Sequence, residues 1–245
     1  MKRILLKVQF LGTNYCGWQA QPKLPTIQSE LERAIFETTG EHVRCESSGR
    51  TDAGVHALSM PVMFDSDTRI MPNNIYKALN AHLPNDIKVI SSGEVDSTFH
   101  ARFDVKEKTY AYYFYVCPNE LPYYQTTMAQ VTPPFDFNLA KSVCPHFKGK
   151  HDWVGFASSK TEVSSTVRTI KKISLSALGE NKFCLRVTGD GFLYNMVRII
   201  AGTIIEVGQG KIDPNLVPEI IESKDRSRAG KTAQAVGLVL EDVQY

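Results

Sequence analysis

The order of strand-like and helix-like segments is the feature that most limits what this chain can fold into. Residues 2–10 are rich in apolar and β-branched side chains and lead into a Gly/Asn turn, which predicts a strand. A helix should follow, with Thr26 as its N-cap, apolar residues at helical spacing, and Gly40 as its end. Because strands and helices mix without strict βαβ alternation, we expect an α+β fold with a largely antiparallel sheet flanked by helices.

The remaining segments give each half of the chain both strands and helices. Further strands are predicted at 87–95, 109–116 and 236–243, a hairpin at 167–178 and 182–188, and helices at 73–83, after Asp136, within 192–207 and after Asp213. We therefore expect two similar α+β lobes, residues 1–104 and 105–245, the first carrying the loop around Asp52.

Charge, cysteine content and hydropathy exclude several classes of protein. The chain has 245 residues, and its 28 Lys and Arg against 26 Asp and Glu are too balanced to demand a polyanionic partner, so any nucleic-acid surface must be a patch. Five cysteines without a CxxC pair support neither a disulfide framework nor a zinc site. The apolar stretch 192–207 contains the charged residues Arg198 and Glu206 and is shorter than the roughly 20 residues that a bilayer crossing needs. We expect no membrane association and a reducing cytoplasm as the compartment.

The sharpest local feature is the segment 48–57, in which two glycines flank Arg50, Thr51 and Asp52. This pattern indicates a tight loop whose backbone and charged side chains come close to a ligand. An ordinary Asx-type turn with a surface arginine is equally consistent with this sequence. An aspartic protease would need a second such motif, and a glycosidase a second positioned carboxylate, which the sequence neither identifies nor excludes.

Aromatic and basic residues coincide in two neighbouring segments, 99–103 and 106–115. Such a combination can stack bases and contact phosphates, although at least half of the strand aromatics must fill the core. Two basic segments, 168–172 and 224–231, are either solvated faces or phosphate contacts.

Arg198 lies inside the apolar stretch and needs an anionic partner there. Glu206 is eight residues away, about 12 Å along a helix, so a carboxylate from a loop is the better candidate.

Several motifs, in order along the whole chain, resemble those of the TruA family of tRNA pseudouridine synthases. They are GTNY (12–15), GWQ (17–19), GRTDAGVHA (49–57), FHARF (99–103), KTY (108–110), HD (151–152), GFLYNMVR (191–198) and GL (237–238). The resemblance implies a two-lobed α+β fold with an active-site cleft between the lobes, a homodimer, and isomerisation of uridines 38, 39 and 40 in the tRNA anticodon arm. It also implies that no metal or other cofactor takes part.

The same resemblance assigns the site residues. Asp52 would be the essential carboxylate, paired with Arg198, and Tyr110 would stack on the target base. Arg50 would help to extrude the nucleotide, and Leu238 would lie near the uracil. Asp52, Arg198 and Tyr110 are thus the expected catalytic residues, and Arg50, Tyr110 and Leu238 the expected substrate-binding residues.

The chain departs from the family pattern at 59–62, Trp153 and Val239, none of which is a presumed catalytic residue. These departures leave the choice of uridines open, including a paralogue with a different RNA target. A non-catalytic RNA-binding protein and a nucleoside-cleaving glycosidase are the alternatives from other classes. The residues also leave open whether Asp52 attacks the base, attacks the sugar or removes a sugar proton.

Overall fold

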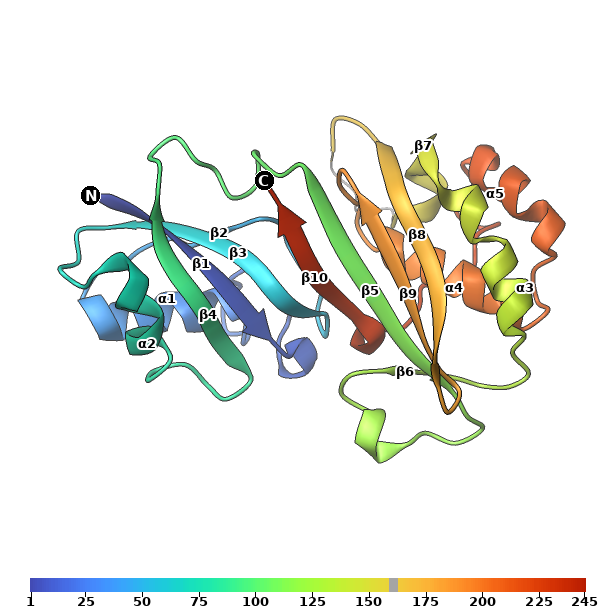
Figure 1. Ribbon diagram of the computed structural model, residues 1–245, viewed down its shortest axis with the longest axis horizontal. Coiled ribbons are helices and arrows are strands. Elements are labelled where there is room, and N and C mark those ends of the chain that lie inside the picture. The colour runs from blue at the N-terminus through green and yellow to red at the C-terminus, as the bar shows by residue number, and fades with distance from the viewer. Residues whose placement is uncertain (159–162) are drawn as a thin grey trace. The chain divides into compact units, whose positions relative to one another are not determined.

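The computed structural model describes residues 1–158 and 163–245. The chain forms two compact units, which are unit 1 (Met1–Lys106 with Val239–Tyr245) and unit 2 (Glu107–Leu238). Each unit combines a sheet with helices (Figure 1), which confirms the α+β prediction. The units differ from the predicted ranges 1–104 and 105–245 in the last strand, which belongs to unit 1 because it pairs there with a strand from the N-terminal half.

Unit 1 is a mainly antiparallel sheet in the order β4–β1–β3–β10, with the short β2 also on β3. Only the β3–β10 pairing is parallel. Its elements are β1 (Lys2–Phe10), α1 (Ile27–Thr39), β2 (Glu46–Ser47), β3 (His56–Ser66), α2 (Ile75–Leu79), β4 (Ile87–Val95) and β10 (Leu238–Gln244). The prediction for residues 2–10 and 87–95 is confirmed to the residue.

Helix α1 begins and ends as its sequence predicts. Thr26 and Ser29 form a reciprocal capping box, and Gly40 ends the helix in the left-handed conformation at φ 75°. The helix predicted at 73–83 is shorter, and α2 ends at Leu79. The side chain of the next residue, Asn80, bonds both the N–H and the C=O of Val89 on β4.

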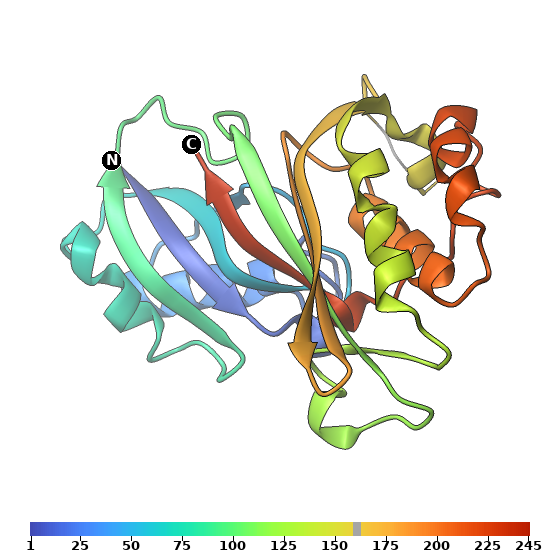
Figure 2. The same cartoon turned by 45° about the vertical axis from the view of Figure 1, so that its right-hand side comes forward.

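Unit 2 has the sheet order β5–β9–β8–β7, with β6 parallel to β5. Its elements are β5 (Glu107–Val116), β6 (Ala129–Val131), α3 (Phe137–Ser142), β7 (Gly149–Asp152), β8 (Val167–Gly179), β9 (Lys182–Gly189), α4 (Met196–Gly208) and α5 (Val217–Ser223). The three helices gather on one side of β8 (Figures 1 and 2). The predicted hairpin is confirmed, and positive φ angles at Glu180 and Asn181 fit a type I′ turn.

The buried helix expected within 192–207 is α4, which begins at Met196 rather than at Phe192. Nearly every side chain of α4 is buried, so the helix forms the centre of the unit 2 core. In the described part of the chain, no helix is both long and apolar enough to cross a membrane.

Candidate active site

Asp52 lies half-buried in the loop that joins β2 to β3, and backbone hydrogen bonds hold this loop against residues 12–18. The N–H of Val55 donates to the Asp52 carbonyl at 3.1 Å, which closes the turn. The N–H of Trp18 donates to the Thr51 carbonyl at 3.0 Å, and the N–H of Gly54 donates to the Tyr15 carbonyl at 3.4 Å. The backbone on both sides of Asp52 is therefore fixed within unit 1.

Glycines make this close approach of two backbones possible. Gly17 has a φ of 90°, and a Cβ atom added there would lie 2.6 Å from the Thr51 carbonyl oxygen. A Cβ atom at Gly12 would overlap the Val55 carbonyl oxygen. Any side chain at these two positions would push the Asp52 loop away from its support.

Two buried polar groups complete the support of the loop. His56 is 5% exposed, and its Nδ1 accepts the N–H of Gly12 at 2.9 Å, which places a neutral ring's proton on Nε2. The Tyr15 hydroxyl donates to an Asp86 carboxylate oxygen at 2.6 Å, and burial raises the pKa of Tyr15 above its ordinary value. We assign His56 and Tyr15 to holding the loop.

Arg50 belongs to the same loop but faces solvent. Its guanidinium forms no hydrogen bond or ion pair with the residues that the structure describes, although it is only two residues from Asp52. An exposed guanidinium of this kind is available to an incoming ligand.

Arg198 lies in the first turn of α4, in unit 2, and two hydrogen bonds orient its side chain. Its Nε donates to the Ala233 carbonyl at 2.8 Å, and its Nη1 donates to Asn195 Oδ1 at 2.7 Å. Asn195 is itself held in the left-handed conformation at φ 62° and donates to the Ser158 hydroxyl at 2.8 Å. Since a cation at a helix N-terminus opposes the helix dipole, the position favours an anionic partner for Arg198.

Tyr110 is a half-buried residue of β5, on the sheet face that also carries Tyr112. The Tyr110 ring meets Phe192 edge to face, with 5.3 Å between centroids and 89° between planes. Tyr112 is fully buried and donates its hydroxyl to the Gln234 carbonyl at 3.0 Å. Burial raises the pKa of Tyr112, and the positive charge of Arg198 acts in the opposite direction.

Leu238 is the buried first residue of β10. It follows Gly237, where an added Cβ atom would lie 2.5 Å from the Tyr113 carbonyl oxygen. The path of the chain into β10 is therefore tightly packed against β5 backbone just before Leu238.

The structure thus places the predicted site residues in two groups. Asp52 and Arg50 share a loop of unit 1, whereas Tyr110 and Arg198 belong to unit 2. Leu238 is the last residue of unit 2, and β10 continues from it into unit 1. The proximity of Asp52 to Arg198 stays a prediction from sequence. Sequence reasoning missed the residues that hold these groups, chiefly Gly17 and Asn195. Asn195 could have been found, because an asparagine directly before an apolar helix is a typical N-cap residue, and it lies only three residues before Arg198.

The basic segment 224–231 is largely used by the fold. Lys224 pairs with Asp152 at 3.0 Å, and Arg228 pairs with Glu219 at 2.9 Å. Arg226 donates to the carbonyls of Ala229 and Gly230 and to the Thr232 hydroxyl. These contacts favour a structural role over the phosphate contact considered from sequence.

Asp152 also has a structural role, because it accepts from the Thr166 hydroxyl and pairs with Lys224; these contacts lower its pKa. Among residues 1–158 and 163–245, no cluster of His, Cys, Asp and Glu side chains has the make-up of a metal site.

Comparison with known proteins gives a family. The sequence profile described as tRNA pseudouridine synthase matches residues 7–104 and 143–245, a range that includes Asp52 and Arg198 but not Tyr110. "tRNA pseudouridine synthase A" of Clostridium acetobutylicum is 43% identical over 245 residues, and each chain is covered completely. The protein of the same name from Acetivibrio thermocellus is 44% identical over 248 residues, again with complete coverage of both chains.

One solved structure that matches has low sequence identity. The chain in the "Crystal Structure of a Cbf5-Nop10-Gar1 Complex" is 12% identical with a TM-score of 0.43, and the match covers 97% of this chain but only 48% of that one. Such a likeness says nothing about function. By the family profile and the full-length relatives, the chain belongs to the tRNA pseudouridine synthase family, a family of isomerases.

Proposed function

We propose that the protein converts uridines 38, 39 and 40 of the tRNA anticodon stem-loop to pseudouridine, with Asp52 as the catalytic carboxylate. Family membership supports pseudouridine formation in tRNA. The observation that carries the assignment of Asp52 is its loop, in which a half-buried carboxylate stands on a backbone fixed from both sides. The three target positions rest on the motif resemblance alone.

The chemistry needs little more than a carboxylate, confinement and the movement of a proton. The bond from C1′ to N1 breaks, the base turns, C1′ joins C5, and the proton on C5 is lost as N1 takes one up. Atoms and electrons balance within the nucleoside, so the step calls for neither an oxidant nor a reductant. Asp52 can serve by attack on the base, by attack on the sugar or by removal of a sugar proton.

The remaining site residues would deliver the base to Asp52. A stacked base must be flipped out at a cost of a few kcal/mol and then held. The exposed guanidinium of Arg50 is suited to occupy the space that the base leaves. Tyr110 would stack on the flipped uracil and Leu238 would contact its edge, while Arg198 would pair with Asp52 and keep the carboxylate ionised.

The test is to incubate the protein with unmodified tRNA and to map pseudouridine at single-nucleotide resolution. We expect modification at positions 38, 39 and 40 without release of free uracil. Free base would instead identify a nucleoside-cleaving glycosidase, and binding without any product would identify an RNA-binding protein. Modification elsewhere would contradict the assigned positions. This mapping is necessary because the chain departs from the family pattern at 59–62, Trp153 and Val239. A relative from Clostridium perfringens is named "tRNA pseudouridine synthase A 2", and a genome with two such enzymes can divide the target uridines between them.

Tyr110→Phe should retain much more activity than Tyr110→Ala. Stacking on a base is worth roughly 1–3 kcal/mol and does not need the hydroxyl. The edge-to-face contact with Phe192 is also preserved by phenylalanine. The measurement is kcat/KM on unmodified tRNA, with melting temperature as the control for folding. Equal inactivity of two folded variants would instead make the hydroxyl the working group and Tyr110 a proton-transfer residue.

We also propose that the protein works as a homodimer in the cytoplasm, on the strength of the family resemblance. Sedimentation equilibrium of the purified chain, at the concentrations used for activity, measures whether it is a dimer. A monomer that is fully active would contradict it.

A further inference from the structure

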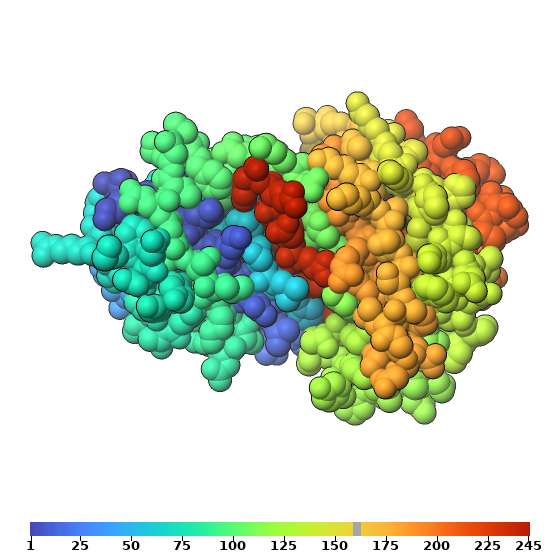
Figure 3. Space-filling model, in the orientation of Figure 1, coloured from blue at the N-terminus to red at the C-terminus, as the bar shows by residue number. Residues whose placement is uncertain are grey.

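An exposed aromatic ring stands on the loop that follows β4 in unit 1. Phe103 is 73% exposed, and its ring lies on the His100 imidazole with 4.3 Å between centroids. The guanidinium of Arg102 lies 5.7 Å from the centre of the same ring. We call these three residues the Phe103 platform. The loop reaches the surface in Figure 3, in the green segment after β4.

The platform is fixed rather than loosely attached. His100 Nδ1 accepts from the N–H groups of Arg102 and Phe103, at 3.1 and 3.4 Å, and its Nε2 lies 3.2 Å from a Glu46 carboxylate oxygen. Asp104 closes the loop, because its carboxylate accepts the His100 N–H at 2.8 Å. A single exposed phenylalanine needs no explanation, but one whose backbone is fixed by the His100 side chain is prepared to bind.

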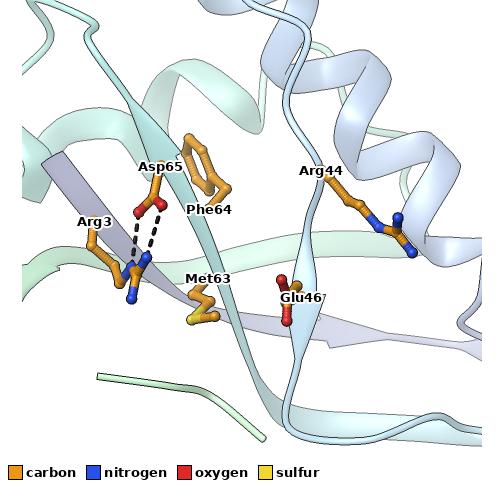
Figure 4. Close-up of a pocket in the computed structure, with 6 residues that line it drawn as sticks. All are labelled: Arg3, Arg44, Glu46, Met63, Phe64 and Asp65. Carbon is orange, nitrogen blue, oxygen red and sulfur yellow. Dashed lines mark hydrogen bonds and ion pairs between the residues drawn. The ribbon is translucent and has the colours of Figure 1, made fainter. Parts of the chain in front are cut away.

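The loop is also tied to the two central strands of the unit. Arg3 on β1 forms two 2.8 Å hydrogen bonds to Asp65 on β3 (Figure 4) and donates a third to the Phe99 carbonyl at 3.0 Å. The fully buried Ala101 lies against Met63, whose sulfur accepts its N–H at 3.4 Å. The platform therefore keeps its position relative to β1 and β3.

The charges around the platform leave two cations available. Glu46 is engaged by His100, and Asp104 by the loop backbone. The exposed guanidinium groups of Arg102 and Arg44 form no hydrogen bond or ion pair with any residue in the described part of the chain. Arg44 lies two residues before Glu46, the residue whose carboxylate contacts His100, and Figure 4 shows the Arg44 side chain extending from this segment. An exposed aromatic ring near guanidinium groups that form no ion pair is the chemistry that binds an unpaired nucleotide.

The platform lies far from Asp52 within the same unit. Phe10 pairs with Ala57 at the end of β1 next to the Asp52 loop, and Arg3 pairs with Asp65 at the other end. Ala57 and Asp65 are eight residues apart on β3, which is about 26 Å at the rise of a strand. A nucleotide on Phe103 is therefore not the target uridine but belongs to another part of the same RNA.

We propose that the Phe103 platform binds an unpaired nucleotide of the tRNA outside the target loop, with its base stacked on Phe103 and its phosphates on Arg102 and Arg44. The proposal rests on the proposed function for the identity of the RNA. It gives unit 1 a second point of contact, by which an intact tRNA is distinguished from a fragment that carries the same uridine.

The experiment compares full-length unmodified tRNA with a minimal hairpin that contains the target uridine and a short stem. Phe103→Ala should weaken the binding of full-length tRNA by about 5- to 150-fold, the equivalent of one lost base stack, and should not change hairpin binding. At saturating tRNA the kcat should stay at the wild-type value, while KM rises. Phe103→Trp should keep the affinity, and Arg102→Gln should reduce the salt slope of log Kd by roughly 0.7–0.9. Met71→Ala, which removes another exposed apolar side chain of unit 1, is the matched control.

Three results would overturn the proposal. They are an unchanged affinity of the folded Phe103→Ala variant for full-length tRNA, an equal loss on both RNAs, and a loss of oligomer without a loss of affinity. The last result would show that the platform contacts a second copy of the chain. Failure of the proposed function is seen separately, as absence of pseudouridine with the wild-type protein on either RNA.

Discussion

Asp52→Asn should abolish pseudouridine formation and leave the affinity for tRNA close to the wild-type value. Asparagine has nearly the same shape but can act neither as a nucleophile nor as a base, and loss of such a group costs far more than about 10³-fold in rate. The loop should survive, because the Asp52 backbone carbonyl accepts from Val55 and the bonds of Thr51 and Gly54 do not involve the carboxylate.

The measurement is a single-turnover rate with enzyme in excess over unmodified tRNA, which separates the chemical step from binding and product release. Asp67→Asn is the matched control, because Asp67 is an exposed carboxylate of the same unit that pairs with the N-terminus. The control should turn over normally. A rate for Asp52→Asn within about tenfold of wild type would remove Asp52 from the chemistry.

Elements with strong local signals could be predicted from the sequence. In β1, every second residue from Ile4 to Phe10 is apolar and buried, as in a strand with one face on the core. Helix α1 has its N-cap at Thr26 and its C-cap at Gly40. The turn at Glu180 and Asn181 joins two strands that are neighbours in sequence, so its register follows from the turn. The caps of α1 and the hairpin turn are formed by residues close in sequence, whereas β1 is recognisable from its own alternation although its pairing partners β3 and β4 are distant.

Elements that depend on distant partners were missed. No strand was predicted at β3, where Pro61 interrupts a run of apolar residues and removes one ladder donor. Pairing with β1 and β2 holds β3 in place, and the Pro61 carbonyl still accepts the N–H of Ser48. The parallel pairing of β10 with β3 joins the C-terminal strand to a strand more than 170 residues earlier in the sequence, which no local pattern encodes.

The candidate site shows the same division. The Asp52 loop is recognisable because its glycines and charges are consecutive in the sequence. Gly17 supports this loop across 34 residues at Thr51, and Ala233 holds Arg198 across 35 residues; in both cases a backbone carbonyl takes part, which no sequence pattern marks. The catalytic carboxylate could therefore be proposed from a contiguous motif, whereas the contacts that hold it and Arg198 in position could not be predicted.

Arg198→Met should reduce kcat/KM by roughly 10²–10³-fold, the usual cost of losing one charged donor from an active site. The affinity for tRNA should change much less, because the role proposed for Arg198 is to stabilise a carboxylate rather than to contact phosphates. Methionine fills the volume of the arginine stem in the first turn of α4, so the core around it is kept. Arg198→Lys keeps the charge but loses the geometry of the hydrogen bonds to Ala233 and Asn195. Its kcat/KM should lie between those of the wild type and Arg198→Met.

The pH dependence tests the proposed pairing of Arg198 with Asp52 directly. A neighbouring cation favours the ionised form of a carboxylate, so its removal makes ionisation require a higher pH. The acidic limb of the pH profile of kcat/KM should therefore move upward in Arg198→Met and stay near its wild-type position in Arg198→Lys. Arg226→Met is a suitable control for loss of a half-buried arginine, since the Arg226 guanidinium donates to residues of the loop at 229–232. An acidic limb that is unchanged in Arg198→Met, in a variant that is folded and slow, would show that Arg198 acts on something other than the carboxylate.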